Sequence, residues 1–260
     1  FEGPDGVGKT SAAIWLARLV NCESDGAEAE PCGQCWSCRM IPEDRHPDVI
    51  RIAPDPEKAT QIISVSQARD LVSQLRMKPY KARRRFVIIE PADTLTTEAA
   101  NALLKTLEEP PPHVKFLFAT TERNKVPDTI LSRCQVLQLD PITEPVISAH
   151  LEHVFAAEGV KVAEGVTAGV ARMARGGMRD ALSIADRLIS LAGKELEEQT
   201  AHRPDVDGLG VDARSVLAAH VHLGRQVEWR AALGVDAGLG DAGEDLLGKA
   251  EIAELDGVAV

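Results

Sequence analysis

The segment from Gly3 to Thr10 has the most recognisable chemistry in the chain, and it reads Gly-Pro-Asp-Gly-Val-Gly-Lys-Thr. It fits the pattern G-x-x-x-x-G-K-[ST], in which backbone N–H groups surround the phosphates of a nucleoside triphosphate. In that pattern the lysine reaches the β- and γ-phosphates and the threonine hydroxyl binds Mg²⁺. Residues 11–20 favour a helix, so the phosphates would lie at a helix N-terminus, where the dipole favours anions. We therefore expect a phosphate site made of Gly3, Asp5, Gly6, Val7, Gly8, Lys9, Thr10 and Ser11.

A second group consists of four of the five cysteines, which are Cys22, Cys32, Cys35 and Cys38. In a cytosolic chain such clustering favours metal binding over disulfides. Four thiolates complete a tetrahedral Zn²⁺ site with no open position, which is typical of a structural site. We expect Zn²⁺ to stabilise an insertion with few apolar residues, the alternatives being free thiols or a redox pair. His46 is expected at a turn or strand start instead of on the metal.

Further candidates lie where predicted strands end. Residues 86–89 form a continuous apolar run, as in a parallel strand buried on both faces. An acid at the end of such a strand holds Mg²⁺ in nucleoside triphosphatases, so Glu90 is the first candidate and Asp93 the second. The apolar strand 114–119 runs into Thr120 and Thr121, and polar residues at this end of a strand face the ligand crevice of open α/β sheets.

The elements that must position these residues alternate along the chain. Strands are predicted over 49–52, 86–89, 114–119 and 136–139, and helices over 11–20, 65–77, 98–109 and a short stretch after Pro127. This order predicts an α/β fold with a parallel, doubly wound sheet. Helices over 145–157, 162–175 and 178–192 predict a small second domain. We expect a core at 1–142 with a zinc module at 22–38, a helical domain at 143–194, and an unassigned acidic tail, rich in Gly and Ala, at 195–260.

Composition narrows the class of function. The formal net charge of −11 disfavours a free-standing nucleic-acid binder, but not a subunit that meets DNA inside a larger ring. The basic segment 78–85 is interpreted either as a solvated approach to the next strand or as a DNA-phosphate contact. No run of 18 uncharged apolar residues is present, so no membrane span is expected. Without an initiator Met or a signal peptide, we expect a cytoplasmic protein and an N-terminally truncated sequence.

Two further motifs identify a resemblance. Residues 101–110 read Asn-Ala-Leu-Leu-Lys-Thr-Leu-Glu-Glu-Pro, and residues 132–134 read Ser-Arg-Cys. With the phosphate loop and the four cysteines, they make residues 1–192 similar to the ATPase subunits of the bacterial DNA polymerase III clamp loader, within the AAA+ family. The resemblance implies a P-loop AAA+ sheet with flanking helices, a zinc-binding insertion and a three-helix lid domain. It also implies ATP, other clamp-loader subunits in a hetero-oligomeric ring, the sliding clamp, and primed DNA reached only through the assembled complex.

The resemblance also implies roles for single residues. Thr121 matches the residue that senses the γ-phosphate, and Arg179 matches the lid arginine that contacts nucleotide in its own subunit. Arg133 matches the arginine finger, which acts in trans on ATP held by the neighbouring subunit. The catalytic set is thus Glu90, Arg133 and Thr121. The family pattern at positions 90–91 is Asp-Glu, and Pro91 cannot polarise a water molecule. The sequence therefore supports ATP binding more strongly than hydrolysis by an ATPase of the polymerase complex.

Two branches of the family share these motifs. Segments 119–122, 125–127 and 177–183 resemble the gamma/tau branch, whose ATP cycle loads the clamp on primed DNA in replication. Segments 46–48, 75–85 and 91–93 resemble the delta-prime branch, a stator or scaffold that donates its arginine finger without hydrolysing ATP. The intact phosphate loop favours gamma/tau, with delta-prime as the alternative.

Overall fold

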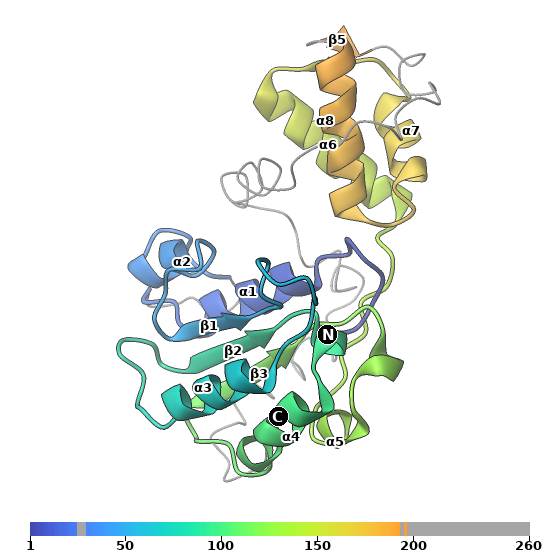
Figure 1. The fold of residues 1–260 in the computed structure, drawn as a ribbon. Helices are drawn as coiled ribbons and strands as arrows, with labels where there is room; N and C mark the ends of the chain where they lie inside the picture. Colours follow the sequence, from blue (N-terminus) through green and yellow to red (C-terminus); the bar gives the residue numbers. More distant parts are fainter. Residues whose placement is uncertain (25–29, 193–194, 197–260) are drawn as a thin grey trace, which may run out of the picture. The chain divides into compact units, whose positions relative to one another are not determined.

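A computed structural model describes residues 1–24, 30–192 and 195–196. The predicted tail lies outside the described residues except for its first two positions. The described chain divides into two compact units (Figure 1). Within the described ranges, the first contains residues 1–3 and 9–138, and the second contains residues 4–8, 139–192 and 195–196.

The first unit is built on a parallel sheet, as predicted. Strands β1 (Val49–Ile52), β2 (Arg85–Ile89) and β3 (Val114–Phe118) lie in the order β1-β2-β3. All residues of β2 are buried, because this strand has a neighbour on each side and helices on each face. The continuous apolar run that predicted a central strand therefore has its expected position.

The sheet continues beyond β3 through single bridges. Glu2 forms parallel bridges with Thr120 and with Gln138. Its N–H donates to the Leu137 carbonyl at 2.9 Å, and the Thr120 N–H donates to the Phe1 carbonyl at 3.0 Å. The predicted strand over 136–139 is therefore wrong in extent. Among the described residues only Glu2 pairs with this segment, and one partner residue supports one bridge instead of a ladder.

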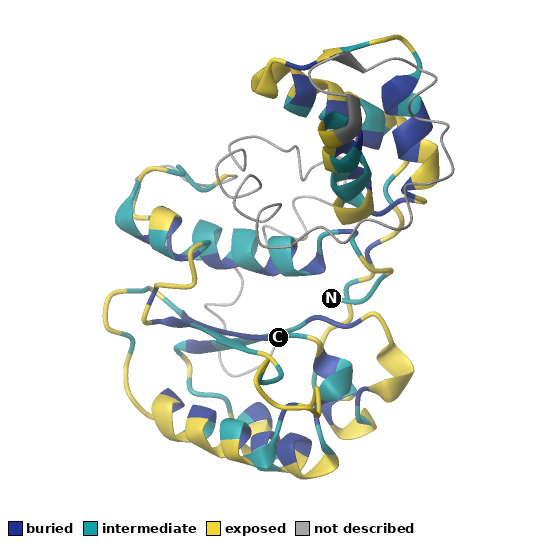
Figure 2. Cartoon of the chain, turned by 45° about the horizontal axis from the view of Figure 1, so that its top comes forward, coloured by how far each residue is buried: buried dark blue, intermediate teal, exposed yellow. Residues whose placement is uncertain are grey.

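Helices cover both faces of the sheet (Figure 1). Helix α1 (Lys9–Val20) lies on one face, and helices α3 (Val65–Leu75) and α4 (Thr97–Glu108) lie on the other. Strand β2 contributes side chains to the apolar cores on both faces of the sheet. Phe86 and Ile88 pack with residues of α1 on one face. Val87 and Ile89 pack with residues of α3 and α4 on the other. Figure 2 shows the helix faces turned to the sheet as buried.

Shorter elements complete the first unit. Helix α2 (Trp36–Met40) lies in the cysteine-rich segment, and α5 (Asp128–Leu131) follows the 3-10 turns η1 (Ala92–Thr94) and η2 (Arg123–Lys125). Both helices on the second face have polar caps at their N-termini. Ser64 forms a capping box with Gln67 at the start of α3, and the Thr96 hydroxyl accepts the Ala99 N–H at the start of α4.

The described part of the second unit contains three helices, α6 (Glu144–Glu158), α7 (Val166–Met173) and α8 (Met178–Ala192). They enclose an apolar core that includes Ile147, Leu151, Phe155, Val170 and Leu188. The helix predicted over 162–175 starts later than expected. Strand β4 (Lys161–Val162) pairs with β5 (Glu195–Leu196), and Gly165 at φ 89° precedes the helix. No helix in the described part of the chain is long and apolar enough to cross a bilayer.

Candidate nucleotide site and cysteine cluster

The glycine-rich loop has the backbone conformation that its sequence requires. Gly6 and Gly8 have φ values of 74° and 97°, a region that side chains disfavour. Helix α1 begins at Lys9, so the N–H groups of its first turn have no partner within the helix. Lys9 is buried, and its Nζ donates to the Gly3 carbonyl at 3.0 Å. A glycine-rich loop that leads into a helix start favours anion binding, and the assignment of the phosphate site stays a prediction.

Thr10 and Glu90 meet although 80 residues separate them. The Thr10 hydroxyl, in the first turn of α1, donates to the carboxylate of Glu90, which follows β2. The other carboxylate oxygen of Glu90 lies 3.7 Å from a guanidinium nitrogen of Arg51 on the neighbouring strand. A hydroxyl beside a carboxylate offers the oxygen ligands that Mg²⁺ prefers, so these two residues fit a magnesium ion.

The acid that follows Glu90 is Asp93, three residues further along the chain, whereas the family pattern has an acid at position 91. Pro91 is exposed and carries no acidic group. Asp93 accepts a hydrogen bond of 2.5 Å from the hydroxyl of Thr120. Thr120 is buried and Thr121 is exposed, so the threonine that contacts Asp93 is Thr120, to which the sequence analysis gave no specific role. The assignment of Thr121 as γ-phosphate sensor stays a prediction.

In the second unit, the middle of the glycine-rich loop contacts the start of α8. Arg179 lies 2.9 Å from the carboxylate of Asp5, and the Met178 N–H donates to the Gly6 carbonyl at 3.0 Å. A Cβ atom on Gly6 would lie only 3.2 Å from the Cα of Gly177. Gly6 is therefore needed for close approach as well as for its φ value, and the predicted lid arginine contacts the predicted phosphate loop.

Arg133 follows α5, and acceptors of the first unit hold its guanidinium. Its Nη2 atom lies 2.5 Å from the carboxylate of Glu108 at the end of α4. Its Nη1 atom donates to the Thr129 carbonyl at 2.8 Å and to the Ser132 hydroxyl at 3.1 Å. The sequence analysis did not identify Glu108, and only the clustering of acids at the end of the predicted helix pointed to it.

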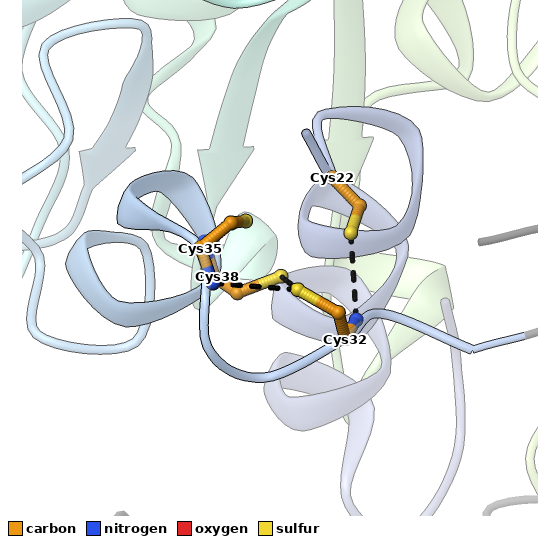
Figure 3. Close-up of side chains that lie close together, drawn as sticks. All are labelled: Cys22, Cys32, Cys35 and Cys38. Carbon is orange, nitrogen blue, oxygen red and sulfur yellow. Dashed lines mark hydrogen bonds between the residues drawn. The ribbon is translucent and has the colours of Figure 1, made fainter. Parts of the chain in front are cut away.

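The four clustered cysteines converge, as Figure 3 shows. Their sulfur atoms all lie within 4.8 Å of one another, and the sulfurs of Cys32 and Cys38 are 4.0 Å apart. Around a tetrahedral Zn²⁺ ion with Zn–S distances of about 2.3 Å, neighbouring sulfurs lie about 3.8 Å apart. Cys22 follows α1, whereas the other three lie in or before α2. The residues present therefore fit a structural metal ion.

Backbone N–H groups already point at these sulfurs. The Cys32 sulfur accepts from the N–H groups of Gln34 and Cys35 at 3.5 and 3.3 Å, and the Cys35 sulfur accepts from Cys38 at 3.4 Å. A hydrogen bond from the Ser24 hydroxyl, followed by these backbone N–H groups, lowers the pKa of Cys32 to about 6. Burial instead raises the pKa of Cys38. Donors around thiolates support metal binding, because they stabilise the charged sulfur.

His46 has the turn role that was predicted for it. It is buried directly before β1, and the Val49 N–H donates to its carbonyl. Its Nδ1 atom accepts the Asp48 N–H at 3.1 Å, its Nε2 atom lies 3.3 Å from the Ser37 hydroxyl, and its ring packs on Trp36. Burial lowers the pKa of His46, which favours the neutral ring that these contacts need.

The basic segment before β2 is held in place by one buried carboxylate. Asp48 accepts the N–H groups of Tyr80, Lys81 and Ala82 at 2.8, 2.8 and 3.0 Å. It also pairs with the buried guanidinium of Arg85 at 2.9 Å. Arg85 is therefore a structural residue, and Lys81 pairs with Glu23 and lies over the ring of Trp36. The two interpretations of the other cations in the segment stay predictions.

A parallel sheet with helices on both faces, a glycine-rich loop leading into α1 and an acid after the central strand together define a P-loop α/β protein. Residues 1–143 match the family model of the DNA polymerase III delta subunit. Residues 146–194 match the model of the ATPase lid domain of DNA polymerase III clamp-loader subunits. The chain therefore belongs to the DNA polymerase III clamp-loader family.

Individual relatives agree with the gamma/tau resemblance. The chain is 41% identical to the DNA polymerase III subunit tau of Bacillus subtilis, over 77% of this chain and 35% of the relative. It is also 41% identical to that of Escherichia coli, over 76% of this chain and 30% of the relative. The chain thus spans about a third of the length of these relatives. Among solved structures, the Thermotoga maritima RuvB Holliday junction branch migration motor has the same fold, with a TM-score of 0.52 and 17% identity over 96% of this chain and 78% of that chain.

Proposed function

We propose that this chain is an ATP-binding subunit of a DNA polymerase III clamp loader of the gamma/tau kind. In this role it acts in a ring with other clamp-loader subunits, and ATP binding favours the arrangement that opens a sliding clamp for loading on primed DNA. Such a cycle requires ATP to bind the two arrangements with different affinities. The glycine-rich loop carries the proposal, because its sequence, its φ values and the helix that follows it all suit a triphosphate.

In this proposal, each residue of the candidate site has a separate role. The loop N–H groups and Lys9 hold the phosphates, while Thr10 and Glu90 hold Mg²⁺, which neutralises phosphate charge when it is bound. Arg179 contacts the nucleotide of its own subunit, and Thr121 responds to the γ-phosphate. Arg133 acts on the nucleotide of the adjacent subunit. Because Pro91 supplies no carboxylate, turnover depends strongly on that trans arginine.

The four cysteines have a structural role in this proposal. Zn²⁺ bound by Cys22, Cys32, Cys35 and Cys38 fixes α2 against the end of α1. The closed set of four thiolates leaves no position for a substrate, so the ion takes no part in the ATP reaction.

Delta-prime is the second candidate, and Pro91 is the observation that favours it. In that case the chain is a stator that donates Arg133 to its neighbour and hydrolyses no ATP. The family model for residues 1–143 carries a delta-subunit description, which agrees with this alternative. The two candidates differ in whether the phosphate loop of this chain contributes to turnover.

A nucleotide titration and a single-turnover ATPase assay distinguish them. In the gamma/tau role, Lys9→Ala weakens ATP binding by about 10- to 100-fold, because a charge-assisted contact to phosphate is lost. It also reduces turnover of the assembled complex, and Arg133→Ala reduces turnover by roughly 10³-fold or more. Lys58→Ala, which removes an exposed lysine, is the control and changes neither quantity.

One result would exclude the gamma/tau role. If Lys9→Ala leaves turnover unchanged while Arg133→Ala abolishes it, the chain acts as a stator. If neither substitution changes turnover, the nucleotide-linked role of the chain is wrong.

A further inference from the structure

Glu108 and Arg133 come from separate elements and meet at one point of the first unit. Glu108 is the last residue of α4, and Arg133 lies two residues beyond α5. Their side chains approach to 2.5 Å, across 25 residues of sequence. Strand β3 lies between them in the chain, so tertiary packing and not local sequence brings them together.

The guanidinium of Arg133 retains free donors in this arrangement. A guanidinium has five N–H groups. One is used by Glu108, and two are used by the Thr129 carbonyl and the Ser132 hydroxyl. Two N–H groups therefore remain without a partner among the described residues, and the side chain is 32% exposed. The arginine is fixed from one side and can still donate to an anion outside the chain.

We propose that Glu108 is a positioning residue for Arg133, holding the guanidinium in the orientation in which it meets the nucleotide of the neighbouring subunit. This inference rests on the arginine-finger role in the proposed function. An unrestrained arginine must lose the freedom of its long side chain when the reaction occurs. A side chain that is already oriented avoids this loss, which is how preorganised groups accelerate a reaction.

The geometry distinguishes this pair from an ordinary surface ion pair. The Lys125–Glu122 pair is also close, at 2.6 Å, but it joins two exposed side chains only three residues apart in the sequence. Arg133 has a carboxylate on one nitrogen and a backbone carbonyl plus a hydroxyl on the other. Contacts on both nitrogens fix the plane of the guanidinium, which a single contact cannot do.

The test is steady-state ATP hydrolysis by the assembled complex with Glu108→Gln, which gives both kcat and KM. We expect kcat to fall about two- to fivefold, the range that corresponds to the loss of one partly exposed ion pair. The KM for ATP stays unchanged, because Glu108 acts on the neighbour's nucleotide only through Arg133. Glu108→Asp restores part of the loss. Glu109→Gln, which neutralises the adjacent exposed acid, is the matched control and leaves kcat unchanged.

A double-mutant cycle separates positioning from a structural role. Glu108→Gln should have no further effect on kcat in an Arg133→Ala background, because the group it positions is gone. An equal loss in both backgrounds, unchanged turnover, or faster turnover with Glu108→Gln would overturn the inference. If Arg133→Ala itself has no effect, the arginine-finger role fails, and that failure is visible before Glu108 is tested.

Discussion

At the scale of single residues, the most consequential group outside the candidate nucleotide site is Asp48. It is fully buried, yet it accepts three backbone N–H groups and pairs with Arg85. Burial alone would raise the pKa of this carboxyl. The backbone N–H groups and the guanidinium outweigh burial and lower the pKa from 3.8 to about 2. The charged form is thus the one that the fold stabilises.

This carboxylate makes stability depend on pH. Because the pKa of Asp48 is lower in the folded protein than in the unfolded chain, its contribution is complete above about pH 4 and is lost as the pH falls toward 2. At neutral pH, Asp48→Asn should lower the free energy of unfolding by roughly 3 kcal/mol, since Arg85 is left buried without its partner. Urea unfolding across this pH range measures the difference between the two proteins.

The difference should shrink as the pH approaches the lower pKa. Asp70→Asn is the control, because it neutralises an exposed carboxylate on α3. If Asp48→Asn destabilises the protein by the same amount from neutral pH down to about pH 2, the charge of the Asp48 carboxylate does not stabilise the fold.

The role of a residue could be predicted where a short contiguous stretch of sequence specifies it, and could not where it depends on contacts between distant elements. The phosphate loop is a contiguous pattern, and Glu90 was found because an acid at the end of an apolar strand has a known place in the sheet. Glu108 and Asp48 were not found as partners, because their roles depend on packing between elements. Asp48 accepts hydrogen bonds mainly from backbone N–H groups. Every residue except proline has such a group, so the side chains of that segment do not indicate the contact.

At the scale of elements, helix α2 is the helix that the proposed zinc ion would stabilise most. It has five residues, which is far too short to be stable alone in water. Three of the four cysteines lie within it or in the four residues before it, so an ion held by all four would tie this helix to the end of α1. The helix should therefore lose its order when the ion is removed.

Metal removal provides the corresponding experiment. Elemental analysis of protein purified without chelators should give about one zinc per chain, as expected for one closed four-thiolate site. A chelator, or Cys32→Ser, should lower the midpoint of thermal unfolding. Cys134→Ser is the matched control and should leave the zinc content unchanged, since Cys134 lies outside the cluster. Absence of metal from the untreated protein would contradict the zinc assignment.

The elements themselves were largely predictable where a strand or helix carries its own pattern. Strand β2 and helix α4 were predicted because an apolar run and a capped amphipathic segment specify them locally. The strand expected over 136–139 was wrong in extent because a ladder also needs a partner, and the apolar pattern of one segment says nothing about the length of the other.

At the scale of the whole molecule, the proposal divides each catalytic site between two subunits. The phosphate loop belongs to one copy and Arg133 to the next. A chain with Lys9→Ala lacks the first half but retains the second, and a chain with Arg133→Ala has the opposite defect. The two defects should therefore complement each other wherever copies of this chain are neighbours in the ring.

Mixing the two variants tests this arrangement. Rings assembled with either variant alone should hydrolyse ATP at rates reduced by roughly 10³-fold, and rings assembled from a mixture should recover a substantial part of the wild-type rate. Steady-state ATPase assays measure the recovery, and native mass spectrometry verifies that mixed rings form. Mixed rings that remain inactive would show that the arginine and the loop do not act across this interface.

The bridges made by Glu2 have a consequence for the synthesis of the protein. Glu2 lies between Thr120 and Gln138 in the sheet, although it precedes them by most of the length of the first unit. A ribosome makes the phosphate-loop end of the chain long before either neighbour. Glu2 can therefore make both bridges only after residue 138 has been synthesised. The edge of the sheet beyond β3 is thus completed late, after strands β1, β2 and β3 have all been made.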